Sequence, residues 1–96
     1  MSISGELVQF DYTNPHAWVH VNAPDASGTM HRYAAEWASP TRLGRQGIVK
    51  DTLRVGDRVV LTGSPGRDVS EYRMHLKRID RPFDGWSWKG GRERRR

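Results

Sequence analysis

Residues 39–47 read Ser-Pro-Thr-Arg-Leu-Gly-Arg-Gln-Gly, and this stretch decides how the rest of the chain is interpreted. Ser39 can cap a helix and Pro40 suits the first helical position, while a glycine a few residues later can end it. We therefore expect one short helix here. Leu43 and Ile48 are the apolar residues through which so short a helix would contact a core.

Strand-like sequence lies on both sides of this helix. Three runs rich in β-branched or aromatic residues precede it and two follow, each bounded by turn residues: Ile3–Tyr12, His16–Asn22, Thr29–Trp37, Arg58–Gly63 and Tyr72–Ile79. A change of phase near Leu7 indicates a bulge in the first run, as is common where a strand curves round a barrel. In the second run, the alternation favours an inward Val19 and an outward Trp18.

Five strands with one helix between the third and the fourth is the element order of an oligonucleotide/oligosaccharide-binding (OB) barrel. We therefore predict an all-β fold, a small five-stranded OB-like barrel with one short helix between strands 3 and 4, near residues 40–46. Strands of six to ten residues and regular turn signals favour the closure of a small barrel. Another five-stranded barrel, or a β-sandwich that lacks strands, is the alternative.

The length and composition of the chain set its domain organisation. Ninety-six residues suffice for one domain with a small core. We expect the OB-like domain to span residues 1–84, and a Trp-, Gly- and Arg-rich C-terminal tail, residues 85–96, to be disordered. The absence of cysteine excludes disulfides and thiolate metal sites. No run approaches the roughly 18 apolar residues of a membrane-spanning helix, so no membrane span is expected.

The net charge of +5 is concentrated at the C-terminal end of the chain. Residues 89–96 carry a net charge of +4, which leaves +1 for the other 88 residues. A domain that binds nucleic acid through its body normally carries a basic stripe, and a nearly neutral body does not supply one. Any nucleic acid would therefore bind this chain weakly and chiefly through the tail.

The segment Thr13-Asn14-Pro15-His16-Ala17-Trp18 places an imidazole and an indole at the mouth of an expected β-hairpin. Binding residues are frequent on such loops, and in an OB barrel this loop and the loop that holds Arg67 rise on the same side of the binding face. We predict a ligand-binding site in which Trp18 is the flat contact and Arg67 the anion partner. Its candidate residues are Asn14, His16, Trp18, His20 and Arg67. A structural role fits equally well, because Asn14 could bond its own turn and His16 a backbone carbonyl.

Further spaced motifs accompany this segment over roughly residues 4–80: Glu36, Ser39-Pro40, Leu43-x-Arg45-x-Gly47, Asp51-x-Leu53, Gly56-Asp57 and Gly63-x-Pro65-x-Arg67-Asp68. Together they resemble a bacterial family of small, usually exported domains of unknown function that share a T-N-P-H-x-W motif. The resemblance implies a small OB-like barrel and a periplasmic location, and it implies no activity. This chain shows no signal peptide after Met1, so a cytoplasmic location stays open.

Catalytic chemistry has little support in the sequence. The chain has no cysteine nucleophile and no elbow-type serine motif, and four histidines among eleven carboxylates guarantee some chance pairs. Glu36 stands beside Trp37 in an otherwise apolar run, and we expect it to pair with Arg32 or Arg45 rather than to act as an acid or base. We therefore predict a non-enzymatic binding or interaction module with no cofactor. Its partner would be an unknown small ligand or protein, and the chain would act as a monomer or weak dimer.

Two other binding functions stay open. A copper or other metal site could use the pairs Met30-His31 and Met74-His75, which fall on strands that are neighbours in an OB barrel. We expect instead that both methionines fill the core and both histidines face water, and that a metal would rely on His16 or His20. Single-stranded nucleic acid could bind the OB face through Trp18 and the basic tail.

Removal of residues 89–96 tests the charge argument. Because phosphate contacts release counterions, we expect any affinity for single-stranded DNA to fall steeply with salt and to be mostly lost in the shortened protein. Fluorescence anisotropy with a labelled oligonucleotide at low and high salt measures both effects. Unchanged affinity after the deletion would contradict the prediction and assign the binding to the OB face.

Overall fold

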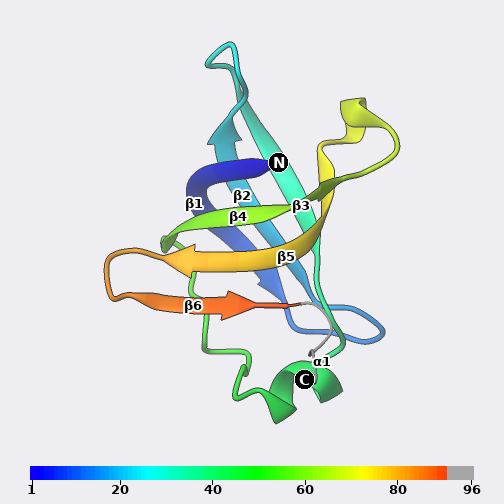
Figure 1. Ribbon diagram of the computed structural model, residues 1–96, viewed down its shortest axis with the longest axis vertical. Helices are drawn as coiled ribbons and strands as arrows, with labels where there is room; N and C mark the ends of the chain where they lie inside the picture. The colour runs from blue at the N-terminus through cyan, green and yellow to red at the C-terminus, as the bar shows by residue number, and fades with distance from the viewer. Residues whose placement is uncertain (91–96) are drawn as a thin grey trace, which may run out of the picture.

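Six strands and one short helix follow one another along residues 1–90, which are the residues that the computed structural model describes (Figure 1). The elements are β1 (Ser2–Asp11), β2 (Trp18–Pro24), β3 (Met30–Glu36), α1 (Pro40–Arg45), β4 (Arg58–Pro65), the 3-10 turn η1 (Val69–Glu71), β5 (Arg73–Arg81) and β6 (Trp86–Lys89). Three strands thus precede α1 and three follow it. The predicted all-β class and the helix between the third and fourth strands are confirmed.

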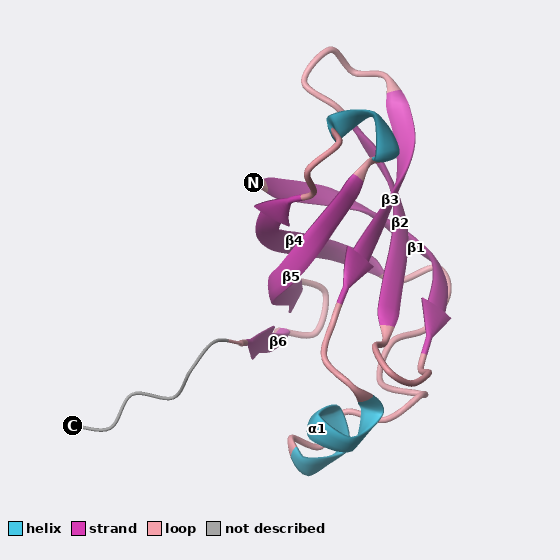
Figure 2. Cartoon of the chain, turned by 90° about the vertical axis from the view of Figure 1, so that its right-hand side faces the viewer, coloured by secondary structure: helices cyan, strands magenta, loops and turns pink. Residues whose placement is uncertain are grey.

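The first five strands close into a barrel. Antiparallel pairs join them in the order β3-β2-β1-β4-β5, and a parallel pair between β3 and β5 closes the circle. This last pair is short: it joins Ala34 to Arg73, Ala35 to Met74 and Glu36 to His75. Figure 2 shows the strands wrapped round one interior, with α1 at one end. The predicted small five-stranded barrel is therefore confirmed.

β1 curves so that it can pair with two strands. Its first half pairs with β4 and its second half with β2, and the register slips between Leu7 and Gln9, as the phase change in the sequence predicted. Gly5 allows β1 and β2 to approach closely, because a Cβ at this position would overlap the carbonyl oxygen of Asn22. Gly63 has the same role beside the slip in β4, where a Cβ would overlap the carbonyl oxygen of His75.

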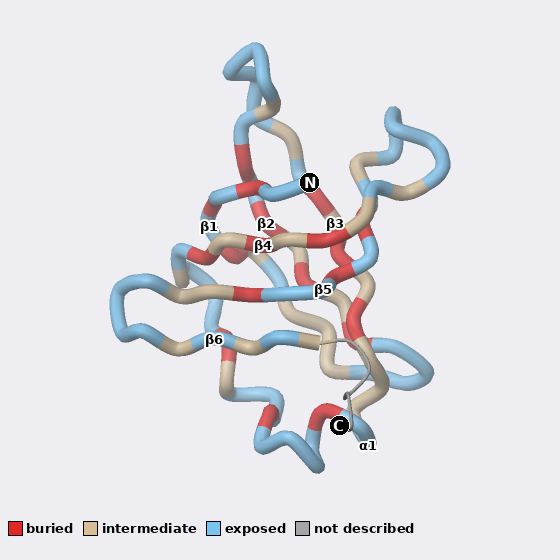
Figure 3. The backbone as a smooth tube through the Cα atoms, viewed as in Figure 1, coloured by how far each residue is buried: buried red, intermediate tan, exposed pale blue. Residues whose placement is uncertain are grey.

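The core is formed by alternate residues of every barrel strand, which Figure 3 shows as buried positions along the tube. Val19 and Val21 point inward from β2, as their parity predicted, and no polar or charged residue within residues 1–90 is buried. At the end of the barrel, α1 adds Leu43 to this core. The helix is built as expected: the Ser39 side chain accepts a hydrogen bond from the backbone N–H of Arg42 at 3.3 Å, and a proline begins its first turn.

β6 corrects the predicted domain boundary. We expected residues 85–96 to be a tail, yet Trp86–Lys89 pair with the second half of β5 as a sixth strand outside the barrel. The indole of Trp88 explains this ordering, since it packs edge-to-face on Trp37 at 5.2 Å and donates a hydrogen bond to Oε1 of Gln46 at 2.9 Å. Residues 91–96, the rest of the predicted tail, lie outside the described residues. A deletion that removes the basic tail and leaves β6 intact therefore starts at residue 91.

Alanine substitutions at three glycines test this account of strand packing. We expect Gly5→Ala and Gly63→Ala each to lower the free energy of unfolding by about 2–3 kcal/mol, because backbone of a neighbouring strand must move. Gly44→Ala is the control: it lies in α1, the nearest atom to its new Cβ is the Tyr12 hydroxyl at 3.8 Å, and alanine should stabilise the helix by about 0.5–1 kcal/mol. Urea denaturation measures all three. Gly5→Ala and Gly63→Ala proteins as stable as the parent would show that the strands are not so closely packed.

Candidate functional site

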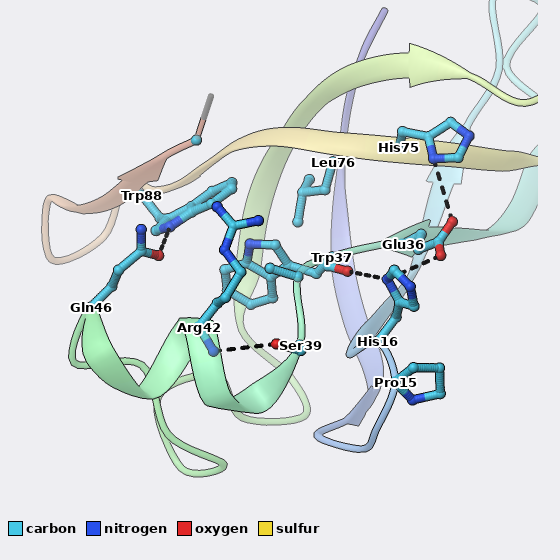
Figure 4. Close-up of a pocket in the computed structure, with 12 residues that line it drawn as sticks. Pro15, His16, Glu36, Trp37, Ser39, Arg42, Gln46, His75, Leu76 and Trp88 are labelled. Carbon is cyan, nitrogen blue, oxygen red and sulfur yellow. Dashed lines mark hydrogen bonds and ion pairs between the residues drawn. The ribbon is translucent and has the colours of Figure 1, made fainter. Parts of the chain in front are cut away.

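Three adjoining hollows lie on one side of the barrel. The largest, about 610 Å³, is the Trp88 cleft, lined by Pro15, His16, Glu36, Trp37, Ala38, Ser39, Arg42, Gln46, His75, Leu76, Trp88 and Gly90 (Figure 4). The Arg67 hollow, about 370 Å³, is lined by Trp18, Glu36, Gly66, Arg67, Asp68, Glu71, Arg73, Met74 and His75. The His20 hollow, about 260 Å³, is lined by Asp11, Trp18, His20, Ala34 and Arg73.

Shared walls make the three hollows one continuous surface, which we call the lateral surface. Glu36 and His75 line both the Trp88 cleft and the Arg67 hollow. Trp18 and Arg73 line both the Arg67 hollow and the His20 hollow. The lateral surface therefore runs across the outer faces of β2, β3 and β5, between the β1–β2 loop and the β4–β5 loop.

Glu36 holds two histidines from different parts of the chain. Its Oε2 lies 3.2 Å from Nδ1 of His16, in the β1–β2 loop, and its Oε1 lies 3.4 Å from Nδ1 of His75, on β5. Nδ1 of His16 is also 3.2 Å from the backbone carbonyl oxygen of Trp37. The Trp37 carbonyl oxygen is an acceptor, so Nδ1 of His16 carries a proton and donates it there. The approaches of both Nδ1 atoms to Glu36 are contacts at ion-pair distance.

This cluster corrects one prediction about Glu36, whose expected partners were Arg32 or Arg45. It confirms the alternative in which His16 bonds a backbone carbonyl at the end of the barrel. The two histidines approach different oxygens of Glu36, so they flank the carboxylate rather than converge on one point (Figure 4). No group of three His, Cys, Asp or Glu side chains in residues 1–90 is arranged to hold a metal ion.

The methionine–histidine pairs of the metal hypothesis are separated by the fold. Met74 is buried, as expected, but Met30 is 60% exposed and the prediction of a core role for it was wrong. Met30 begins β3 before that strand meets β5, so no neighbouring strand covers it from that side. His31 bonds Asp25 at 2.7 Å and stacks on Tyr72, with the ring centroids 4.0 Å apart, which gives this histidine a structural role.

Trp18 lies at the centre of the lateral surface. Its ring faces the Arg73 guanidinium, whose Cζ is 5.9 Å from the ring centroid, and His20 lies on the same face of β2. His20 bonds Asp11 at 3.1 Å, and the hydrogen bonds from Gln9 and His20 hold the pKa of Asp11 below its usual value. Trp18 is thus a half-buried platform between charged side chains.

The β4–β5 loop is held in shape by Asp68. Its Oδ1 accepts hydrogen bonds from the hydroxyl of Ser70 at 2.6 Å and from the backbone N–H of Ser70 at 3.0 Å. These bonds lower the pKa of Asp68, so the residue stays ionised beside Arg67. The loop therefore presents a cation and an anion together at the edge of the Arg67 hollow.

Four of the five predicted binding residues lie on the lateral surface. His16 lines the Trp88 cleft, Trp18 and Arg67 the Arg67 hollow, and His20 the hollow named after it. Asn14, which precedes a cis peptide bond to Pro15, lines none of the three. Their role in binding stays a prediction.

Sequence reasoning missed three residues of the Trp88 cleft. Trp88 was assigned to the tail, although the alternation of Trp86-Ser87-Trp88 is typical of a strand. Arg42 was considered only as part of the helix, and His75 only as part of a methionine–histidine pair. The position of His75 depends on the register between β3 and β5, for which the sequence has no local signal.

The imidazole tautomers test the Glu36 cluster. At about pH 8, where histidines are neutral, we expect Nδ1 to carry the proton in both His16 and His75. Glu36→Ala should remove this preference from His75, whose Nδ1 then has no acceptor, and leave it in His16, which keeps the Trp37 carbonyl. Nitrogen-15 NMR of the imidazole rings distinguishes the two tautomers. An equal response of both histidines, or none in His75, would contradict this geometry.

Comparison with known proteins identifies a family but no function. The family of unknown function DUF6152 matches residues 1–74, which is the chain from β1 to the start of β5. No curated protein and no solved structure matches the chain. No helix within residues 1–90 is long and apolar enough to cross a membrane. The sequence resemblance to a family of unknown function is thereby confirmed, and the chain belongs to DUF6152.

Proposed function

We propose that this protein is a non-enzymatic binding module whose contact surface is the lateral surface. The observation that carries the proposal is the continuity of the three hollows through Glu36, His75, Trp18 and Arg73. A concave surface with aromatic walls and a few fixed polar groups is the usual form of a small-molecule site. Here the polar groups are held by contacts within the protein itself: Nδ1 of His16 bonds the Trp37 carbonyl, and Glu36 lies at ion-pair distance from both histidines.

The strand order supports an OB assignment, which we make part of this proposal. OB barrels bind their ligands on the face of strands 2 and 3, between the loops that join strands 1 to 2 and 4 to 5. The lateral surface occupies the corresponding position, with Trp18 on β2, Glu36 on β3 and Arg67 in the β4–β5 loop. This support is an analogy between folds, and it favours binding without naming the ligand.

The residues that line the cleft include no well-placed nucleophile, which favours binding over catalysis. The Nδ1 contacts of His16 and His75 with a carboxylate resemble the way a catalytic histidine is oriented. Ser39 is the hydroxyl-bearing residue that lines the cleft, and its Oγ accepts the capping hydrogen bond of α1. A serine engaged at a helix start is poorly placed to attack a substrate.

The charges of the Arg67 hollow and the cellular location of the protein are the last parts of the proposal. The Arg67 hollow mixes two arginines with Glu36, Asp68 and Glu71, so its field suits a polar small ligand better than a polyanion. We propose a periplasmic location, in keeping with the usually exported family that the sequence motifs resemble.

Substitutions in the lateral surface test the proposed function. NMR titration against glycans, small metabolites and short oligonucleotides should identify a ligand that shifts signals of the lateral surface. Trp18→Ala and Arg67→Ala should each weaken its binding by about tenfold or more, since aromatic and arginine contacts dominate most binding sites. Val55→Ala is the control, because Val55 is 70% exposed and lines none of the hollows. A ligand that shifts only residues remote from the lateral surface would show that the site is elsewhere.

A further inference from the structure

The Trp88 cleft has an apolar wall large enough for a small organic molecule. Trp37, Leu76 and Trp88 supply this wall, and the volume of about 610 Å³ lies within the range of small-molecule sites. The two indoles meet edge-to-face at an interplanar angle of 76°. A ligand with a flat or branched apolar body would bury its surface against these side chains.

Arg42 supplies a cation at the wall of the cleft. Arg42 lines the cleft from α1 and forms no ion pair with any residue in the described part of the chain. Glu36 is the carboxylate that lines the cleft, and its two oxygens lie against Nδ1 of His16 and of His75, on the side of the cleft away from α1. An anionic group would therefore find a free guanidinium, the side chain best suited to a carboxylate.

A second donor, on a residue that lines the cleft, also lacks a partner. Nε1 of Trp37 is buried and has no hydrogen-bond partner within residues 1–90, on a residue that is 3% exposed. A buried donor without an acceptor costs free energy, and such a group in a native structure requires an explanation. Figure 4 shows Trp37, Trp88 and Arg42 round the same part of the cleft. An acceptor oxygen that enters there when Trp88 shifts would supply the missing partner.

We propose that the Trp88 cleft binds a small carboxylate with an apolar body, whose carboxylate is held by the Arg42 guanidinium and the Trp37 Nε1–H. The apolar body lies against Trp88 and Leu76. Because Trp88 covers the edge of Trp37 and is held by its bond to Gln46, binding requires a shift of the Trp88 ring. This inference rests on the proposed function and specifies the ligand class of one part of the lateral surface.

Three probes of related chemistry test the ligand class. Phenylacetate carries both the charge and the apolar body, phenylacetamide lacks the charge, and acetate lacks the apolar body. We expect phenylacetate to bind saturably and to shift the indole N–H signals of Trp37 and Trp88 in two-dimensional NMR. The other two compounds should bind at least about tenfold more weakly.

Two arginines of α1 provide a matched pair of variants. Arg42→Gln removes the proposed contact and should weaken phenylacetate binding by about tenfold or more, whereas Arg45→Gln, on the same helix but outside the cleft, should leave it unchanged. Both residues are exposed, so both variants should keep the fold, which the dispersion of the NMR spectrum verifies.

The outcomes separate this inference from the proposed function. Equal binding of phenylacetate and phenylacetamide, or equal losses in the two arginine variants, would overturn the carboxylate assignment. Absence of saturable shifts in Trp37 and Trp88 with phenylacetate and with branched aliphatic carboxylates would overturn it as well. If a glycan or metabolite still shifted Trp18 and its neighbours in that case, the binding module would stand and only its ligand class would be wrong. If no compound shifted any part of the lateral surface, both would fail.

Discussion

Three residue pairs between β3 and β5 close the barrel. The parallel pairing of residues 34–36 with residues 73–75 is the last contact needed to close the barrel, and it joins strands that the chain visits far apart. Its final pair sets Glu36 beside His75, so the same backbone register that closes the core also builds the polar cluster of the site. Loss of this register would open the barrel and disperse the cluster together.

The cleft exists because β3 and β5 separate immediately after that pairing. β3 ends at Glu36 and the chain turns toward α1, while β5 continues and takes β6 as its new neighbour. One edge of β5 thus pairs first with β3 and then with β6. The Trp88 cleft lies between these two partner strands. Contacts of Trp88 with Trp37 and Gln46 bridge this space, so that Trp88 covers one edge of the Trp37 indole.

Local sequence patterns predicted the features of this structure that are determined by neighbouring residues in the chain. The serine cap and proline start of α1, the inward parity of Val19, and the bulge near Leu7 all follow from neighbouring residues, and all are present. The partners of Glu36 and the exposure of Met30 depend on which strands meet and in what register, and no short pattern encodes that. β6 was missed for a related reason: its alternation spans only four residues, and the strand is fixed by the bond of Trp88 to Gln46, more than forty positions away.

Polar groups that stabilise the fold can be separated from those available for binding by whether they are satisfied. Arg81 is paired with Asp57 and Asp84, donates to the carbonyl of Thr52, and its guanidinium lies near two aromatic rings, so nothing is left for a ligand. Arg42 makes no such bond within residues 1–90, and the Trp37 indole N–H is buried without one. Because a protein has little reason to bury a donor that nothing accepts, the Trp37 indole supports the proposed carboxylate site, and the exposed Arg42 supplies the charge beside it. Both residues line the Trp88 cleft, where β3 and β5 separate beyond the pairs that close the barrel.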